Sequence, residues 1–212
     1  MRVLIACEFS GIVRDAFIAK GHDAMSCDLL PTERPGPHHQ GEVELILEDG
    51  WDMMIAFPPC TYLCNSGVCH LYMGGRKQAE NSPINTERWD KMEAAAYFFN
   101  MILNRDCNKI AVENPIMHGF ATKIIGRKPD QYVQPYQFGH KISKKTGLWL
   151  RNLPLLVPTK IVEPEWIYYK NGGRCSPDHY KNAFSKTRGK SRSITYQGIA
   201  DCMAATWSED LT

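Results

Sequence analysis

The chain has 212 residues, a length typical of one domain, and its 43% hydrophobic and 23% charged residues exclude a disordered protein. No apolar run approaches the ~20 residues of a membrane helix, and the first apolar stretch is too short for a secretory signal. The eight cysteines are scattered and fall partly in apolar runs, so reduced thiols are favoured over a disulfide framework. We therefore expect a globular protein of the cytoplasm.

The net charge of +2 is unevenly distributed along the chain. Residues 170–192 contain seven lysines and arginines against Asp178 alone, so this segment carries +6 and the remainder of the chain −4. A basic segment on a slightly acidic body suits an anionic partner. A solvated surface loop explains the same charges, and charge alone leaves both interpretations open.

The N-terminal half alternates strands and helices, which favours a parallel α/β sheet. Three apolar runs and one amphipathic pattern predict strands over 2–7, 23–27 and 52–57 and a helix over 12–19. The Pro- and Gly-rich stretch 31–41 predicts a loop, which a short element over 43–47 follows. Pro58 and Pro59 cannot continue a central strand, so the chain must leave the sheet there.

The C-terminal half begins with a long segment, 61–83, that lacks periodicity, and such a loop in a compact domain is usually functional or mobile. Thr86 is a plausible N-cap for the strongly helical pattern that follows. The predicted elements are helices over 86–103, 116–125 and 194–207 and strands over 109–113, 131–134 and 147–150. The stretch 151–192 is rich in Pro, Lys and Arg and shows no clear period.

Polar or reactive residues follow four of the predicted strands. They are Glu8-Phe9-Ser10-Gly11, Cys27-Asp28, Pro58-Pro59-Cys60 and Glu113-Asn114-Pro115. Each motif alone is typical of a turn, a helix start or an inert thiol. Ligands of open α/β sheets bind beyond the carboxyl ends of the strands, so four such motifs together predict a site at that edge.

The order of these motifs resembles the DNA (cytosine-5)-methyltransferase family. That family has a Phe-x-Gly-x-Gly turn, an acidic strand end, a Pro-Cys loop, a Glu-Asn-Val strand end, a Gln-x-Arg-x-Arg strand and a closing helix. The corresponding residues are Phe9-Ser10-Gly11, Asp28, Pro59-Cys60, Glu113-Asn114-Pro115, Lys144-Lys145-Thr146 and Tyr196-Gln197-Gly198. The resemblance covers residues 2–150 and 192–207, and the Pro-Cys and Glu-Asn motifs are its most specific part.

The chain departs from the family pattern at several positions. Val13 and Arg14 stand where the family has glycines, and Thr61 stands where it has Gln or Asn. Lys144 and Thr146 replace two arginines, and Ile199 replaces an asparagine in the last helix. About forty residues fill the position of the target-recognition domain, so the chain is most similar to compact, phage-like members that lack a full domain of this kind.

The resemblance implies a fold and a division of the chain. The fold is the Rossmann-like fold of S-adenosylmethionine-dependent methyltransferases, a mostly parallel α/β sheet with helices on both faces. Residues 1–150 form the catalytic core, and a short basic segment, 151–192, stands in place of the target-recognition domain. Residues 193–212 form a C-terminal helix that packs back on the core.

The resemblance also implies methyl transfer from S-adenosylmethionine to C5 of cytosine in DNA. Cys60 would add to C6 of the ring, which makes C5 nucleophilic, and Glu113 would hydrogen-bond N3 and the exocyclic amine. The implied cofactor residues are Phe9, Ser10, Gly11, Asp28, Glu42 and Pro58. The implied substrate residues are Pro59, Thr61, Ser66, Asn114, Lys144, Lys145, Thr146, Arg188 and Arg192.

The protonation states of the two catalytic residues follow from their roles. A free thiol is only about 3% ionised at pH 7, so the site should either lower the pKa of Cys60 or deprotonate the thiol during attack. Glu113 must carry a proton to neutralise N3, so we expect it to be partly buried with a raised pKa.

Two other functions stay open at this stage. One is a variant pyrimidine C5-modifying enzyme with another donor or a nucleotide substrate, and the other is a non-catalytic DNA-binding relative. The presence of both Cys60 and Glu113 argues against the second, because a pure binding protein needs neither.

Metal, partners and location complete the expectations. Four residues could hold zinc, but they include no Cys-x-x-Cys pair, so no metal site is expected; they are Cys60, Cys64, Cys69 and His70. DNA is the expected partner and no membrane contact is expected, while homodimerisation stays open. If a phage encodes the chain, its location is the cytoplasm of the host cell.

Overall fold

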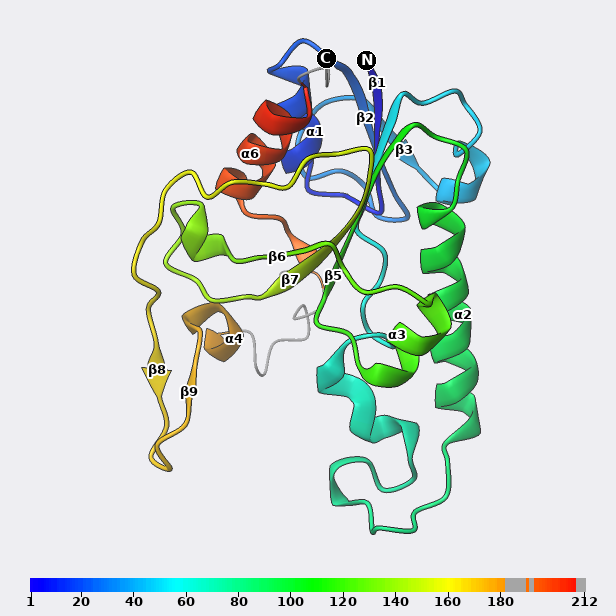
Figure 1. Ribbon diagram of the computed structural model, residues 1–212, viewed down its shortest axis with the longest axis vertical. Helices are drawn as coiled ribbons and strands as arrows, with labels where there is room; N and C mark the ends of the chain where they lie inside the picture. Colours follow the sequence, from blue (N-terminus) through cyan, green and yellow to red (C-terminus); the bar gives the residue numbers. More distant parts are fainter. Residues whose placement is uncertain (182–189, 191–192, 209–212) are drawn as a thin grey trace.

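The computed structural model describes residues 1–181, 190 and 193–208, and its centre is a seven-stranded sheet (Figure 1). In spatial order the strands are β3 (His38–Gln40), β2 (Asp23–Asp28), β1 (Arg2–Ala6), β4 (Met53–Ala56), β5 (Lys109–Pro115), β7 (Thr146–Arg151) and β6 (Gln131–Val133). Neighbouring strands pair in parallel, except that β7 runs antiparallel to both β5 and β6. The prediction of a mostly parallel sheet is confirmed.

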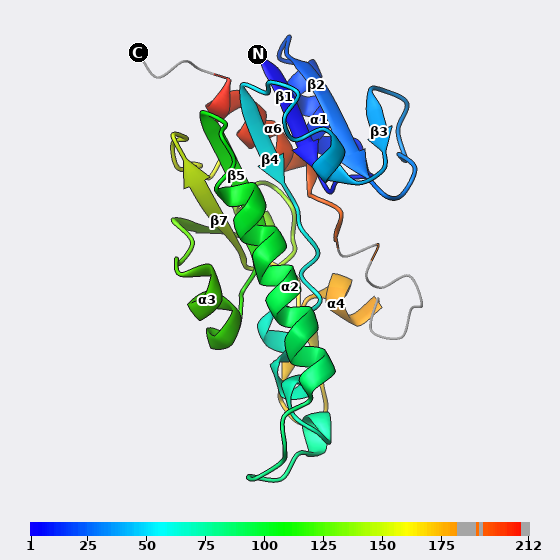
Figure 2. The same ribbon diagram turned by 90° about the vertical axis from the view of Figure 1, so that its right-hand side faces the viewer.

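Helices cover both faces of the sheet, as Figures 1 and 2 show. One face is covered by α1 (Ile12–Ile18) and α6 (Gln197–Trp207), and the other by α2 (Thr86–Leu103) and α3 (Gly119–Ile125). The strand order, the antiparallel β7 and this arrangement of helices are those of the Rossmann-like methyltransferase fold.

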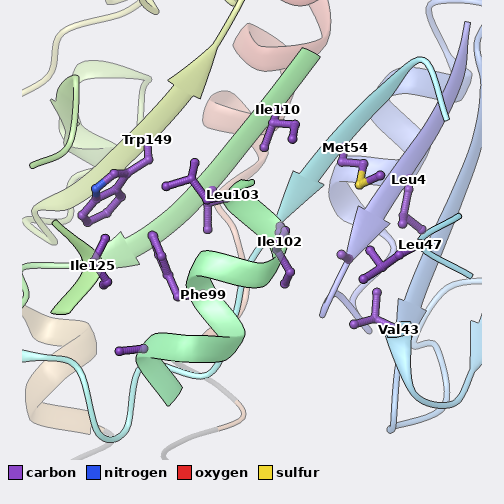
Figure 3. Packing of buried hydrophobic residues seen from close by; sticks show 14 of the residues in the cluster. Leu4, Val43, Leu47, Met54, Phe99, Ile102, Leu103, Ile110, Ile125 and Trp149 are labelled. Carbon is purple, nitrogen blue, oxygen red and sulfur yellow. The ribbon is translucent and has the colours of Figure 1, made fainter. Parts of the chain in front are cut away.

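The sheet has a hydrophobic core on each of its faces. These two cores explain why the strands appear in the sequence as continuous apolar runs. Along β4, Met53 and Ile55 point into the core under α1 and α6, whereas Met54 and Ala56 point into the core under α2. Figure 3 shows this second core, where side chains of α2 pack against Met54 and Trp149. Because both faces are buried, strands of a parallel sheet carry apolar residues at every position.

Two groups of smaller elements lie beyond the carboxyl ends of the parallel strands (Figure 1). One contains the 3₁₀ helices η2 (Asn65–Leu71) and η3 (Gly75–Lys77), which precede α2. The other contains a hairpin of β8 (Ile167–Tyr168) and β9 (Arg174–Cys175), followed by α4 (Pro177–Lys181). Two further 3₁₀ helices are η1 (Val43–Leu45) and η4 (Pro135–Gln137). In the part of the chain that the structure describes, no helix has the length and apolar character of a membrane span.

Two local predictions are wrong. The predicted loop 31–41 contains β3, which pairs with β2 and is aligned by a 3.1 Å hydrogen bond from the Ser26 N–H to the Pro37 carbonyl. The Arg14 side chain holds the preceding turn by donating to the carbonyls of Arg34 and Pro35. The N-cap of α2 is Asn85 rather than Thr86, since the Asn85 side chain accepts a 3.2 Å hydrogen bond from the Arg88 N–H. The aperiodic segment 61–83 is partly ordered as η2 and η3.

Candidate active site

The loop that follows β4 carries Cys60 and is fixed to the end of β5. The side chain of Asn114, fully buried, donates a 3.3 Å hydrogen bond to the Pro58 carbonyl. His118 Nε2 lies 3.0 Å from the Tyr62 carbonyl, and the His118 N–H donates to Leu63 at 3.1 Å. These contacts hold the Pro-Pro-Cys and Glu-Asn-Pro motifs side by side at the carboxyl edge of the sheet.

Glu113 lies at the end of β5, in a small pocket with Phe57, Lys144 and Thr146. Burial raises the pKa of the Glu113 carboxyl, whereas the Lys144 ammonium and a hydrogen bond with Thr146 lower it. Burial is the largest of these effects, so the carboxyl retains its proton to a higher pH than an exposed glutamate. The expectation of a partly buried Glu113 with a raised pKa is confirmed.

Cys60 and Glu113 lie close enough that the charge of Glu113 raises the pKa of the Cys60 thiol. The largest effect on Cys60 is different, however: a hydrogen bond to the Cys64 sulfur raises its pKa, and burial raises it further. The Lys144 ammonium acts in the opposite direction. The surroundings therefore favour the neutral Cys60 thiol, so the first of the two expected routes to a nucleophile, a lowered pKa of Cys60, is wrong.

The low-pKa thiol of this loop is Cys64. The hydrogen bond from Cys60 lowers the pKa of Cys64 to about 5, against the opposing effect of burial. The Ser66 hydroxyl, 3.1 Å from the Cys64 sulfur, and the backbone N–H groups of Ser66 and Gly67 also stabilise its thiolate. The two thiols of this loop therefore act on each other, and the hydroxyl of Ser66 lies on the side of Cys64.

An acidic cavity of about 290 Å³ lies at the carboxyl ends of β1 and β2. Asp28, Glu42 and Glu44 supply its carboxylates, and its apolar wall includes Val43, Pro59 and Phe98. Carboxylates at this place suit the hydroxyls of a ribose, as in dinucleotide-binding folds, and apolar side chains suit a flat purine ring. The structure thus brings Asp28 and Glu42, which the sequence predicts as cofactor residues, into one cavity with Pro59.

The turn between β2 and β3, residues 29–37, is held to α1 by Arg14. This fully buried guanidinium donates to the carbonyls of Arg34 and Pro35 and to the hydroxyls of Ser26 and Thr32, at 3.0–3.2 Å. Gly11 has a positive φ of 76°, and a Cβ there would lie 2.5 Å from Arg14 Nη2. The arginine that replaces a family glycine is therefore a structural part of this turn, and Gly11 leaves room for it.

Other predicted cofactor residues are buried beside the acidic cavity without being among its described lining residues; they are Phe9, Ser10, Gly11 and Pro58. Ser10 hydrogen-bonds the carboxyl of Glu8, which is 5% exposed and whose pKa burial raises. Lys190 lies 5.0 Å from the centre of the Phe9 ring. Phe9, Ser10 and Gly11 thus belong to the turn between β1 and α1, and Pro58 belongs to the loop of Cys60.

A basic cleft of about 530 Å³ separates the Cys64 loop from the β8–β9 hairpin and α4. Its lining includes Cys64, Ser66, Lys144, Lys145, Arg174 and His179. Lys144 also lines the Glu113 pocket, so the pocket and the cleft meet at this side chain. Three predicted substrate residues, Ser66, Lys144 and Lys145, are thereby brought together.

Some of the remaining predicted substrate residues lie beside Glu113, and others do not. Thr146 and Asn114 lie beside Glu113, whereas Thr61 is exposed and its carbonyl accepts a 2.9 Å hydrogen bond from Arg88. Arg188 and Arg192 lie outside the described residues. No three His, Cys, Asp or Glu side chains are grouped as a metal site among the residues the structure describes.

Several residues of the site were missed by sequence reasoning. Cys64 was weighed only as a zinc ligand, although the Cys-x-x-x-Cys spacing allows one hydrogen-bonded turn to bring both residues together. Glu44 and Phe98 of the acidic cavity carry no motif. Tyr196, which lines the Glu113 pocket and lies near Lys144, lies in a motif that was assigned to the last helix.

No known protein family and no curated protein matches the sequence of the chain. Among solved structures, it is similar to an E. coli protein described as a candidate DNA modification methyltransferase encoded within a prophage, with 14% identity and a TM-score of 0.46. It is also similar to a variant of Spodoptera frugiperda DNMT2, with 14% identity and a TM-score of 0.41. These alignments cover 77% and 78% of the chain, which spans 52% and 57% of the matched proteins. Both similarities are too distant to assign a function.

Proposed function

We propose that the chain is an S-adenosylmethionine-dependent methyltransferase that methylates C5 of cytosine in DNA through a covalent Cys60 adduct assisted by Glu113. One observation carries the proposal: the 3.3 Å hydrogen bond from the Asn114 side chain to the Pro58 carbonyl holds the loop of Cys60 against the strand end that carries Glu113. The acidic cavity and the basic cleft both adjoin the loop of Cys60, through Pro59 and Cys64.

Glu113 supplies the acid of the reaction. When a thiol sulfur adds to C6 of cytosine, negative charge develops on the ring and reaches N3. A carboxyl whose pKa burial has raised can place its proton on N3 and neutralise that charge. The Lys144 ammonium and a hydrogen bond with Thr146 stabilise the carboxylate that remains until N3 returns the proton to it.

Cys60 supplies the nucleophile. Its position is fixed because Asn114 holds the loop at Pro58 and because the Cys64 N–H donates a 3.0 Å hydrogen bond to the Cys60 carbonyl. A rigidly placed sulfur avoids the entropy cost of bringing nucleophile and ring together. After addition, C5 of the ring becomes enamine-like and can attack an electrophilic methyl group.

The residues of the acidic cavity fit S-adenosylmethionine. Asp28 would accept from the ribose hydroxyls, Glu42 or Glu44 from the adenine amine, and Val43 and Phe98 would flank the ring. When bound, this cofactor supplies a methyl group activated by a positively charged sulfur. Pro59, which belongs to the cavity and precedes Cys60, links the cofactor side to the nucleophile.

The basic cleft fits the backbone of a nucleic acid. Lys144, Lys145 and Arg174 would contact phosphates, and such contacts position a strand without reading its sequence. A target base in a duplex has to leave the stack, at a cost of a few kcal/mol. Lys144 lies where the cleft meets the Glu113 pocket, so a base that enters beside it reaches both catalytic groups.

The test is the modification itself. The protein is incubated with DNA and S-adenosylmethionine, and the nucleosides are analysed by mass spectrometry, with Cys60→Ala as the control. We expect 5-methylcytosine with the parent chain and none with the variant. A different modified pyrimidine would instead support the variant C5-modifying enzyme, and Cys60→Ala activity equal to that of the parent would reject the mechanism.

Calorimetric titration with S-adenosylmethionine separates the proposal from a DNA-binding relative. The proposal predicts saturable binding that Asp28→Ala weakens about tenfold or more, since a ribose contact is lost. DNA binding without any cofactor binding would favour the non-catalytic relative.

A further inference from the structure

We propose that Cys64 is a catalytic residue that takes the proton of Cys60 when the Cys60 sulfur bonds to C6 of cytosine, and returns it when the sulfur leaves. This inference rests on the proposed function, since it concerns the same site. It supplies the second expected route to a nucleophile, deprotonation of the Cys60 thiol during attack.

The backbone brings the two thiols together. Cys60 and Cys64 are four residues apart on a turn closed by hydrogen bonds from the Leu63 and Cys64 N–H groups to the Cys60 carbonyl, at 3.1 and 3.0 Å. This closed turn brings the two side chains near each other. Each thiol accordingly acts on the pKa of the other.

Backbone contacts with residues 116 and 117 fix the position of Cys64. The following residue, Asn65, donates a 2.8 Å backbone hydrogen bond to Ile116, and Cys64 itself forms a β-bridge with Met117. The segment that pairs with the loop directly follows the Glu113 motif. Cys64, Cys60 and Glu113 are therefore held by one hydrogen-bonded unit.

The surroundings of Cys64 prepare its sulfur to accept a proton. The Ser66 hydroxyl and two backbone N–H groups stabilise the thiolate at residue 64. Cys64 also lines the basic cleft, whereas the neutral Cys60 thiol is more deeply enclosed in its loop. Because the Ser66 hydroxyl lies against the sulfur of Cys64, we assign the proton of the pair to Cys60 before attack.

The step balances in atoms and electrons. The S–H bond of Cys60 breaks, its electron pair forms the S–C6 bond, and the proton passes to the Cys64 thiolate. The Glu113 proton goes to N3 of the ring at the same time. After methyl transfer, water takes the C5 proton, and the electron pair of the C5–H bond forms the C5=C6 double bond as the C6–S bond breaks. The sulfur of Cys60 recovers its proton from Cys64, and N3 returns the other proton to Glu113.

Other charged groups share this environment and could contribute to a pH profile. Glu113 and Lys144 act on Cys60 directly. The remaining charged or titratable groups of the cleft are Lys145, Arg174, Cys175, Asp178, His179 and Tyr169. The test therefore uses the ratio of variant to parent at each pH, in which contributions from these groups cancel.

The first measurement needs neither DNA nor cofactor. Iodoacetamide alkylation of the reduced protein is followed across pH, and the labelled cysteines are identified by mass spectrometry. We expect Cys64 to react as a thiolate below pH 7 in the parent chain, and to need a higher pH in Cys60→Ala. In Cys64→Ser, Cys60 should react only near or above the pH of an ordinary thiol. Low-pH reactivity of Cys60 in Cys64→Ser would overturn the inference.

The second measurement is the methylation rate of Cys64→Ser across pH 6.5–9. We expect a loss of at least tenfold at pH 7 that diminishes as pH rises, because solvent must then remove the Cys60 proton. Cys69→Ser, a cysteine of the same loop, is the control and should match the parent chain. Equal rates for Cys64→Ser and the parent at every pH would overturn the inference.

The two proposals fail in different ways. If the parent chain methylates no cytosine, the proposed function is wrong, and the alkylation profile alone decides whether the thiols share a proton. If Cys64→Ser is inactive at every pH while Cys60→Ser keeps activity, Cys64 is the nucleophile and the proton-acceptor role is wrong.

Discussion

Glu113 has one property that governs its chemistry: burial raises the pKa of its carboxyl. We expect Glu113→Gln to lower the turnover number by about 10²–10⁴, the range for loss of a general acid, because an amide cannot give its proton to N3. S-adenosylmethionine binding, measured by calorimetry, should be unchanged. A variant that loses both turnover and cofactor binding would indicate a structural role instead.

The same raised pKa predicts a change in stability with pH. The folded protein binds the Glu113 proton more tightly than the unfolded chain, so this group destabilises the fold as pH rises from the ordinary carboxyl pKa through the raised one. Glu113→Gln should therefore melt at a higher temperature than the parent at pH 8 and at a similar temperature at pH 4. Equal melting temperatures at both pH values would contradict the raised pKa.

Lys144 is the side chain shared by the Glu113 pocket and the basic cleft. If it contacts a phosphate, Lys144→Met should weaken DNA binding and lower the slope of log K against log salt by about one. Lys141→Met is the matched control, because Lys141 is exposed and paired with Glu165 at 3.2 Å. Salt slopes that are equal for parent, variant and control would place Lys144 outside the interface.

At the scale of elements, Arg14 connects α1 to the turn between β2 and β3. Arg14→Met leaves the carbonyls of Arg34 and Pro35 without their donor, so we expect the free energy of unfolding to fall by about 3 kcal/mol. Arg34→Met is the control, since Arg34 is exposed and its ion pair with Asp15 is 3.7 Å long. Urea denaturation of both variants measures the difference, and equal losses would show that Arg14 is not the connection.

The docking of α6 on the sheet depends on Gly198. A Cβ at this position would lie 2.0 Å from the Phe138 carbonyl oxygen, which is backbone and cannot yield. We expect Gly198→Ala to lower the free energy of unfolding by about 2–4 kcal/mol. Gly119, in the first turn of α3, has nothing within 4 Å of its Cβ position, so Gly119→Ala should be neutral or slightly stabilising. A Gly198→Ala variant as stable as Gly119→Ala would contradict the close contact.

At the scale of the whole molecule, the sheet was predictable because its strands are buried on both faces. Apolar runs bounded by Gly and Pro predict β1, β2, β4 and β5 without knowledge of their neighbours. β3 was not predictable, because its residues depend on a buried arginine from another element rather than on their own pattern. The hairpin β8–β9 was not predictable either, because strands of two residues are too short to show an alternating apolar pattern.

The candidate site likewise has one part that could be predicted from the sequence and another part that could not. Asp28, Cys60 and Glu113 follow predicted strands, so their position at one edge of the sheet could be predicted from chain order. Glu42 was predicted only from the family resemblance, because the strand before it, β3, was predicted as a loop. The partnership of Cys60 with Cys64 could not, because it depends on the closure of one turn and on the side chain of Ser66. The sequence shows that Arg14 stands where the family has a glycine, but it does not show that the Arg14 side chain holds the turn between β2 and β3.

The central claim is that the sulfur of Cys60 and the carboxyl of Glu113 act on one pyrimidine ring. DNA that carries 5-fluorocytosine tests it most directly, because the fluorine at C5 prevents the elimination that would release the enzyme. With S-adenosylmethionine present, we predict a covalent complex whose DNA-linked peptide contains Cys60, and a much slower complex with Glu113→Gln. An adduct at another cysteine, or cytosine methylation without any covalent complex, would contradict the account.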